Sequence, residues 1–378
     1  MQGDYRKGAA GKRGHGRGGA RREPDGRARR PSPSTPPPPT IAPRKILVKP
    51  AAEPALTLRP ATPVLLRPAR RTVPVPKQVV SILDAQLRPQ RNVEEMLVDA
   101  PAVPFSVCGA IGSVASGKST LLSALSRFLL PSLDAATAFN AHSEASLANG
   151  STVTSGVDAI FCEQHVVVDC QALNPLVLGG NAHSLQMQST EVAMFALSVC
   201  NILLVVQDAF CEDSILHTLA SAAMLKRAGA PGDSSSFPSM QHCARCVFVY
   251  NKVPLDRFTP SVRDSLHDRL RAFLDPAAFP STSQPVLNDL LTGDERRDPG
   301  LDLFLVPCSE TATRAHRLTM DELWGKVGQL CQDATASANP SGSFGTWFAD
   351  GSRVADDIRN SRLVSVFSKA VHSQRLFE

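Results

Sequence analysis

The stretch that decides the fold is Gly112-Ser113-Val114-Ala115-Ser116-Gly117-Lys118-Ser119. It matches the phosphate-binding loop pattern Gly-x4-Gly-Lys-Ser/Thr without a mismatch. A β-type run over 103–107 precedes it, and an amphipathic helix predicted over 118–129 follows it. The two glycines let backbone N–H groups turn toward a phosphate, and the helix N-terminus adds a favourable dipole. These flanks favour a phosphate-binding loop over a glycine-rich turn with an exposed lysine.

The residues of this loop have expected roles in holding a nucleotide. Lys118 is expected to neutralise the outer phosphates, and the Ser119 hydroxyl to ligate magnesium. The other candidate nucleotide-binding residues of the loop and the first helical turn are Gly112, Ser113, Val114, Ala115, Ser116, Gly117 and Thr120. The implied ligands are a purine nucleotide and Mg²⁺, and the choice between guanine and adenine stays open.

The chain beyond the loop alternates β-type runs with amphipathic helical stretches. The β-type runs cover 156–162, 166–169, 202–206, 247–250 and 303–306, and the helical stretches cover 81–98, 186–200, 212–227, 261–274 and 320–331. This alternation predicts an α/β fold with a doubly wound, mostly parallel sheet of the P-loop GTPase type. The one expected antiparallel element is a hairpin that turns around residues 163–165.

Two residues beyond the loop are candidates for the metal site. Asp169 ends the apolar run Val166-Val-Val-Asp169, where phosphate-loop proteins place a magnesium-binding carboxylate. Thr154 lies in a loop before a strand, as in the first switch of GTP-binding proteins. The alternatives are a carboxylate that caps a turn and an ordinary loop threonine. We expect Ser119, Thr154 and Asp169 to share the metal.

The base-binding element departs from the GTPase pattern. Asn251 and Lys252 end a buried strand, as in the sequence Asn-Lys-x-Asp that contacts guanine. The fourth position is Pro254, which has no side-chain acceptor, and Asp256 lies two residues further on. We therefore expect Asn251 and Lys252 to bind the nucleotide. Their presence does not establish a preference for guanine.

The element that assists hydrolysis departs as well. A switching GTPase continues Asp-x-x-Gly, often with a glutamine next, whereas this chain reads Asp169-Cys170-Gln171-Ala172-Leu173. Ala172 replaces the glycine whose N–H meets the terminal phosphate, and Leu173 cannot position a water. Hydrolysis should then be slow unless a partner supplies the missing group. We assign no catalytic residue and expect a site that holds a nucleotide without turning it over.

The net charge of +5 divides unevenly along the chain. Residues 1–77 hold 18 Lys/Arg against 4 Asp/Glu and 15 of the 30 prolines, while the remainder has a net charge of −9. A segment so rich in Arg, Gly and Pro cannot bury enough apolar surface to fold alone, so we predict that it is disordered. It is expected either to contact RNA or a protein partner, or to be a solvated extension.

Other protein classes are disfavoured by composition. The longest nearly apolar run, 192–206, contains Ser198 and Asn201 and is too short to span a bilayer, so no membrane segment is expected. Nine scattered cysteines and no secretory signal favour a reduced, cytoplasmic chain. Cys243 and Cys246, with His242, have the spacing of half a zinc-binding site. The favoured interpretation is that they are thiols beside a buried strand. Trp324 and Trp347 are expected to be packing or interface anchors.

Together these segments resemble a known family, the SMG-nine subunits of the nonsense-mediated mRNA decay kinase complex. The resemblance covers roughly residues 95–335 and extends more weakly to the C-terminus. It rests on the phosphate loop and on five further segments: Thr154-Ser-Gly-Val-Asp158, Val168-Asp169-Cys-Gln, Met187-Gln-Ser-Thr-Glu-Val-Ala-Met-Phe, Leu203-Leu-Val-Val-Gln-Asp208 and Leu303-Phe-Leu-Val-Pro307. The family shares the altered Asp-x-x-Gly and Asn-Lys-x-Asp elements.

The resemblance implies a domain organisation and partners. A disordered region (1–77) would precede a GTPase-like domain (78–338) with surface insertions near 228–242 and 275–300, and a helical extension (339–378) would follow. Members pair with a related GTPase-like subunit, SMG-eight, as a heterodimer. The pair binds a phosphatidylinositol-3-kinase-related protein kinase and restrains it.

Three functions therefore stay open. The first is a nucleotide-bound regulatory and scaffold subunit without catalysis. The second is an active GTPase or phosphotransferase, which would need a group such as Glu212 or Asp213 to act in the site. The third is an RNA-binding protein that works through residues 1–77.

Overall fold

A computed structural model describes residues 77–131, 133–134, 139–141, 154–174, 182–208, 212–228, 242–274, 279, 301–308, 313–338 and 342–375. Except for Lys77, the basic arm predicted over 1–77 lies outside these residues. Most of each predicted surface insertion lies outside them too. Within the described part of the chain, no helix is both long enough and apolar enough to cross a membrane.

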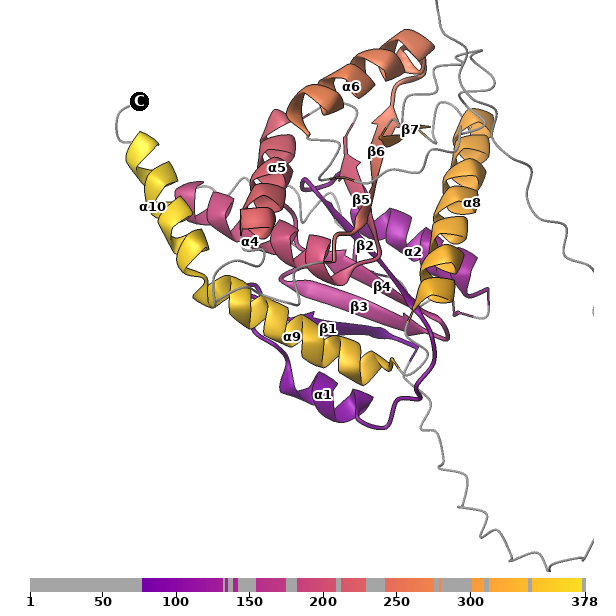
Figure 1. The fold of residues 1–378 in the computed structure, drawn as a ribbon. Coiled ribbons are helices and arrows are strands. Elements are labelled where there is room, and N and C mark those ends of the chain that lie inside the picture. Colours follow the sequence, from indigo (N-terminus) through magenta and orange to yellow (C-terminus); the bar gives the residue numbers. More distant parts are fainter. Residues whose placement is uncertain are drawn as a thin grey trace, which may run out of the picture. The chain divides into compact units, whose positions relative to one another are not determined.

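The described residues form one sheet flanked by helices (Figure 1). Its strands are β1 (Val79–Leu83), β2 (Ser106–Gly112), β3 (Val157–Cys162), β4 (His165–Cys170), β5 (Ile202–Gln207), β6 (Arg245–Val253) and β7 (Asp302–Pro307). Their order is β1-β3-β4-β2-β5-β6-β7. Strands β4, β2, β5, β6 and β7 are parallel, whereas β1 and β4 each pair with β3 in antiparallel fashion. The predicted α/β fold, its mostly parallel sheet and its hairpin are confirmed.

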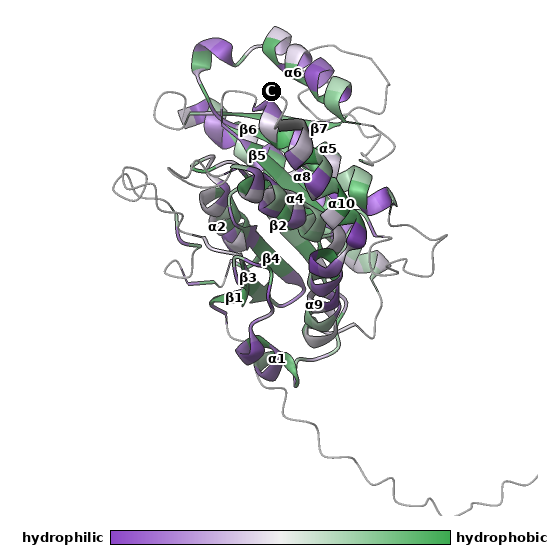
Figure 2. Ribbon diagram, turned by 90° about the vertical axis from the view of Figure 1, so that its left-hand side faces the viewer, coloured by the Kyte–Doolittle hydropathy of each residue, from purple (hydrophilic) through white to green (hydrophobic). Residues whose placement is uncertain are grey.

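Helices cover both faces of the sheet (Figures 1 and 2). They are α1 (Arg91–Leu97), α2 (Lys118–Leu129), α4 (Ala182–Val199), α5 (Asp213–Ala228), α6 (Pro260–Phe273), α8 (Thr313–Ser337), α9 (Phe344–Asn360) and α10 (Arg362–Arg375), with a 3₁₀ turn, η2 (Leu255–Arg257), after β6. Helices α2 and α8 bury apolar side chains against one face, and α4, α5 and α9 bury theirs against the other. The sheet therefore lies between two apolar layers.

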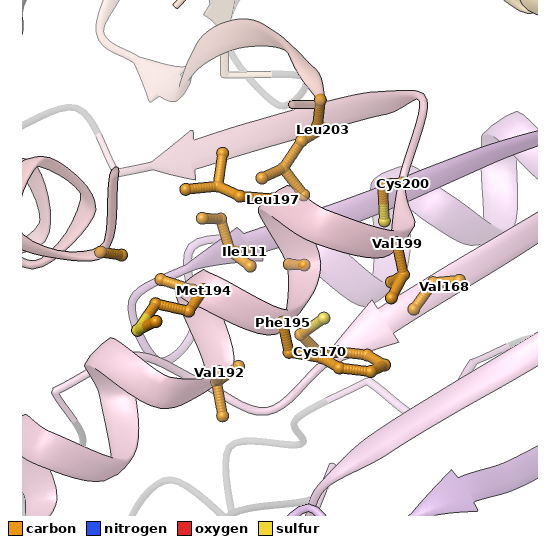
Figure 3. Close-up of a cluster of buried hydrophobic side chains, with 14 of the residues drawn as sticks. Ile111, Val168, Cys170, Val192, Met194, Phe195, Leu197, Val199, Cys200 and Leu203 are labelled. Carbon is orange, nitrogen blue, oxygen red and sulfur yellow. The ribbon is translucent and has the colours of Figure 1, made fainter. Parts of the chain in front are cut away.

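Strand β5 shows why the central runs are almost continuously apolar. Leu203 and Val205 belong to the layer under α4, while Leu204 and Val206 belong to the layer under α2 and α8. A strand that is buried on both faces needs apolar residues at every position. Figure 3 shows the α4 side of this core, where Phe195 and neighbouring residues of α4 lie over the sheet.

The helix predicted over 81–98 is wrong for its first half. Residues 79–83 form β1, and helix α1 is confined to Arg91–Leu97. The Asp84 carboxylate accepts hydrogen bonds from the N–H groups of Gln86 (2.9 Å) and Arg88 (2.8 Å), and so closes a turn between the two elements. An aspartate that binds its own backbone competes with helix formation. The strand predicted over 103–107 starts instead at Ser106 and runs into the phosphate loop.

The C-terminal segment packs on the sheet domain. Helix α9 begins with a capping box between Ser343 and Thr346, and it buries Phe344, Phe348 and Ile358 in the core layer under α4. The Trp347 Nε1–H donates to the Val199 carbonyl at 3.1 Å. Helix α9 thus completes the apolar layer on its face of the sheet. Trp347 acts as a packing anchor, as expected.

Candidate functional site

The phosphate loop lies at the carboxyl edge of the sheet, between the end of β2 and the start of α2. Gly112 pairs with Val206 of β5, and a β-carbon added at Gly112 would lie 1.8 Å from the Val206 carbonyl oxygen. Gly117 adopts φ +92°, and a β-carbon there would lie 2.3 Å from Asn251 Nδ2. Gly112 is thus required by the close approach of the Val206 backbone, and Gly117 by its left-handed geometry. Ala115, at φ +59°, also adopts the left-handed region.

Lys118 is buried inside this loop. Its Nζ donates to the Ser113 carbonyl at 2.8 Å, and the Ser116 hydroxyl donates to the same oxygen at 3.0 Å. Burial lowers the pKa of the Lys118 ammonium, while the Asp169 carboxylate opposes that change. A buried ammonium whose hydrogen bond goes to a backbone carbonyl is well suited to an anionic ligand, because a phosphate would restore the solvation that burial removed.

Ser119, Thr154 and Asp169 meet at one point. The Ser119 hydroxyl donates to Asp169 Oδ2 at 2.7 Å, and the Thr154 hydroxyl donates to the same oxygen at 3.1 Å. Burial raises the pKa of Asp169 to about 6, even though Lys118 and the two hydroxyls favour the charged form. The predicted convergence of these three residues is therefore observed.

The same three residues fit a magnesium ion. Asp169 Oδ1 is buried and has no hydrogen-bond partner among the residues that the structure describes. Oxygen donors from a carboxylate and from hydroxyls are the ligands that Mg²⁺ prefers. When bound, the ion would neutralise charge on the carboxylate and on the phosphates, and it would offset the desolvation of Asp169.

Asn251 and Lys252 reach the loop from the end of β6. Asn251 Nδ2 donates to the Ser116 carbonyl at 2.9 Å, and Lys252 Nζ donates to the Ala115 carbonyl at 2.6 Å. Lys252 Nζ also lies 3.7 Å from Asp208 Oδ2, at the end of β5. These contacts place both predicted residues against the loop. Asp256 lies two residues beyond the position of the guanine-binding aspartate, and it is on the exposed η2 turn.

The segment after Asp169 is tied to its surroundings. Gln171 and Gly156 exchange two hydrogen bonds, of 2.7 Å and 3.0 Å. The Leu173 N–H donates to the Gly112 carbonyl at 2.9 Å, and the Leu173 side chain is fully buried in the core. Asn174 then donates its N–H to the Ser189 hydroxyl of α4 at 2.7 Å. The position that could carry a water-orienting glutamine is thus occupied by a core residue.

A cavity of about 190 Å³ opens over these groups. It is lined by Ala115, Gly117, Lys118, Ser119, Thr120, Ala141, Thr154, Cys170, Ala172 and Lys252. Ala141, Cys170 and Ala172 were not among the predicted binding residues, and nothing in their side-chain chemistry marks them. Asp208 was missed too, although its place directly after an apolar strand was a usable signal.

Of the two weaker catalytic candidates, Asp213 has a partner outside the site and Glu212 acts on Lys118. Asp213 is held by a forked ion pair with Arg269, whose Nη2 lies 2.6 Å from Oδ1. Burial lowers the pKa of Lys118, and the Glu212 carboxylate makes a smaller, opposing electrostatic contribution. In the described ranges, no group of three or more His, Cys, Asp or Glu side chains could hold a metal ion, so the half zinc spacing at Cys243 and Cys246 is not completed there.

Comparison with known proteins agrees with the resemblance of the motifs. No protein-family model matches the chain. Nonsense-mediated mRNA decay factor SMG9 from Xenopus laevis is 27% identical over 271 residues, which cover 62% of this chain and 51% of that protein. SMG9 from Xenopus tropicalis is 27% identical over 213 residues, which cover 50% of this chain and 42% of that protein. The chain is SMG9-like. It spans about half the length of the curated relatives it matches.

Among solved structures, this SMG9-like chain is similar to translation elongation factor SelB from Methanococcus maripaludis in complex with a GTP analogue. The TM-score is 0.28 and the identity is 10%, over 62% of this chain and 35% of that one. At so low an overlap, the P-loop architecture rests on the strand order and on the position of the loop in this chain.

Proposed function

We propose that this SMG9-like chain binds a purine nucleotide with Mg²⁺ and uses it as a structural ligand without hydrolysing it. The support is the cradle formed by the phosphate loop, Lys118, Ser119 and Asp169, together with the contacts of Asn251 and Lys252. At about 100 to 1,000 times its dissociation constant, such a ligand would stabilise the folded state by about 3 to 4 kcal/mol.

One observation carries the non-catalytic part of the proposal. Leu173 is fully buried and its N–H is bonded to Gly112, so the chain cannot present a water-orienting group from this position without unpacking its core. Ala172, which stands where a switching GTPase has its phosphate-contacting glycine, lines the cavity. Phosphoryl transfer depends on such positioning, so its absence favours retention over turnover.

The proposal extends to a role in nonsense-mediated mRNA decay, in the cytoplasm. The similarity to nonsense-mediated mRNA decay factors and the motif resemblance support membership of the decay kinase complex. In that complex the chain would pair with the related SMG-eight subunit, and the pair would bind the phosphatidylinositol-3-kinase-related kinase and restrain it. The identity of the base is left open by Pro254, which removes the acceptor that selects guanine.

The test begins with the full chain purified under native conditions. The protein is denatured, and the released nucleotide is identified by chromatography and compared with the amount of protein. We expect a near-stoichiometric purine nucleotide that is unchanged after hours of incubation with Mg²⁺. The Lys118→Ala variant should release little nucleotide, lose the nucleotide-dependent rise in unfolding temperature and recover less SMG-eight in a pull-down.

The matched control is Lys369→Ala, which removes an exposed lysine from α10. It should retain the nucleotide at the wild-type level. Steady turnover by the wild-type chain that Lys118→Ala abolishes, with assembly intact, would instead support an enzyme and sink the scaffold proposal.

A further inference from the structure

A second and larger cavity lies far from the phosphate loop. Its volume is about 350 Å³, and it is lined by Ser198, Val199, Trp347, Asp350, Gly351, Arg353 and Val354. It thus opens between the C-terminal end of α4 and one side of α9. Helix α4 ends just before β5 begins, so this cavity lies near the amino edge of the parallel strands, opposite the nucleotide site.

Trp347 forms an aromatic wall of this cavity and is held rigidly. Its Nε1–H is bonded to the Val199 carbonyl, and its ring meets the ring of Phe161 on β3 edge-on, with centroids 6.2 Å apart. Gly351 lets α9 approach α4, because a β-carbon there would lie 3.7 Å from Val199 Cγ1. The indole is therefore fixed from one side and still borders the cavity from the other.

The chain enters the sheet close to this wall. Val79 pairs with Ile160 in the antiparallel register of β1 and β3, so the next step of the ladder places Gln78 beside Phe161. Lys77 lies close enough to Cys162 to lower the pKa of its thiol against the larger, opposing effect of burial. Directly opposed residues in such a ladder are about 5 Å apart. The residues that precede Lys77 thus start within a few residues' reach of Trp347.

These preceding residues have the composition of an aromatic-docking segment. Residues 73–76 read Val-Pro-Val-Pro, and Arg70 and Arg71 lie just before them. Prolines pre-set the polyproline II conformation, which extends about 3.1 Å per residue and is bound by grooves with aromatic walls. Four or five residues in this form are long enough to cross from the start of β1 to the indole. Asp350 at the rim already pairs with Arg353, so the docking contact would rest on the prolines and the indole and not on Arg70 and Arg71.

We propose that residues 73–76 of this same chain dock in the α4–α9 cavity as an extended segment, with Trp347 as the platform. The basic arm would thereby be anchored to the folded part at its last residues, while its more distant part is left to reach other partners. A short tether gives an effective concentration in the millimolar range, so even a weak contact would be occupied. The proposal is independent of nucleotide binding, because the two sites lie at opposite edges of the sheet.

The test uses the full chain with the photo-reactive residue p-benzoylphenylalanine in place of Val75. We expect irradiation to produce a cross-link within one chain, which peptide mapping locates in residues 195–199 or 347–354. Adding Pro74→Ser and Pro76→Ser should lower the yield at least about fivefold. The matched control, Pro63→Ser with Pro68→Ser, alters the same arm upstream of the docked residues and should leave the yield unchanged.

Two further results would overturn the proposal. One is a cross-link yield that is insensitive to Pro74 and Pro76, because proximity along the chain would then suffice. The other is a cross-link that appears as a dimer and grows with protein concentration, because the occupant would then be a second copy. The unfolding temperature of each variant is measured alongside, so that a loss of yield is not confused with a loss of fold.

Discussion

The Asp169 carboxyl determines how the stability of the ligand-free chain should respond to pH. Its pKa of about 6 exceeds the ordinary value of 3.8, so the folded chain binds this proton more tightly than the unfolded chain does. The proton's contribution to stability is present at low pH and is lost as the pH rises from about 4 through about 6. Without ligand, the charged carboxylate should cost about 3 kcal/mol at neutral pH.

Asp169→Asn should therefore stabilise the ligand-free chain near pH 7.5 and flatten its stability between pH 4.5 and pH 7. The same variant should lose the extra stabilisation that Mg²⁺ gives to the nucleotide-bound chain. Denaturant unfolding at several pH values, with and without nucleotide and Mg²⁺, measures both effects. The control is Asp256→Asn, at an exposed position that should change neither. An unaltered pH profile in Asp169→Asn would contradict this account of the site.

Leu173 gives a second prediction at the residue scale. Placing an amide in its apolar pocket, as in Leu173→Gln, should destabilise the chain by about 2 to 4 kcal/mol, because the polar group would be buried without a prepared partner. It should produce no gain in nucleotide hydrolysis, alone or with Ala172→Gly. Denaturant unfolding and phosphate release measure the two outcomes. Hydrolysis at GTPase-like rates in the double variant would show that the segment retains switching freedom.

At the scale of elements, the local sequence predicted the helix after the phosphate loop better than it predicted the elements over residues 81–98. The helix predicted over 118–129 agrees with α2 at both ends, because the loop motif and its dipole fix where a helix starts. A helix was predicted over residues 81–98 because the apolar residues Ile82, Leu83 and Leu87 have helical spacing. They are buried instead by strand pairing and by a turn at Asp84, and the partner strand β3 lies over 70 residues away. Pairing over such a distance leaves no local signal.

The capping box of α9 allows an element-scale test. The Ser343 hydroxyl accepts from the Thr346 N–H at 3.1 Å, and the Thr346 hydroxyl accepts from the Ser343 N–H at 2.9 Å. Ser343→Ala should lower the free energy of unfolding by about 1 kcal/mol, because an N-terminal N–H of the helix loses its acceptor. Chemical denaturation measures the change. Ser365→Ala, at an exposed position on α10, should stay close to wild type.

At the scale of the molecule, α9 belongs to the core. Phe344, Phe348, Val354, Ala355 and Ile358 are all nearly inaccessible to solvent. Their burial contributes roughly 1.5 to 3 kcal/mol for each large side chain, which together is comparable to the whole stability of a typical domain. A chain that ends after residue 341 should therefore fail to fold, as judged by circular dichroism and solubility.

A chain that ends after residue 361 is the matched control, because it keeps α9 and loses only α10. It should fold with reduced stability, since Val364 is the buried apolar residue that α10 contributes in the described ranges. If the shorter chain folded as well as the control, α9 would be an accessory element.

The position of α9 also shows where prediction from sequence stops. The candidate site was predictable because Lys118 and Ser119 follow the end of β2 and Asp169 lies near the end of β4, and the carboxyl ends of neighbouring parallel strands meet at one edge. The contact of Trp347 with Val199 joins residues 148 positions apart and follows no motif. Which face α9 covers is decided by shape and apolar area, and these emerge only when the layers pack.

The two loop glycines have a consequence for how the loop would change over evolutionary time. A side chain at Gly112 would collide with the Val206 backbone, and one at Gly117 would have to adopt the left-handed φ of +92°, whether or not a phosphate is bound. Purifying selection for folding alone would therefore preserve the glycine spacing of the motif, even in a descendant that had lost its ligand. Lys118 is under a different constraint, because a buried cation lowers the stability of the folded chain when no phosphate is bound. In an alignment of relatives, drift at Lys118 beside invariant glycines would mark the lineages that had given up the nucleotide.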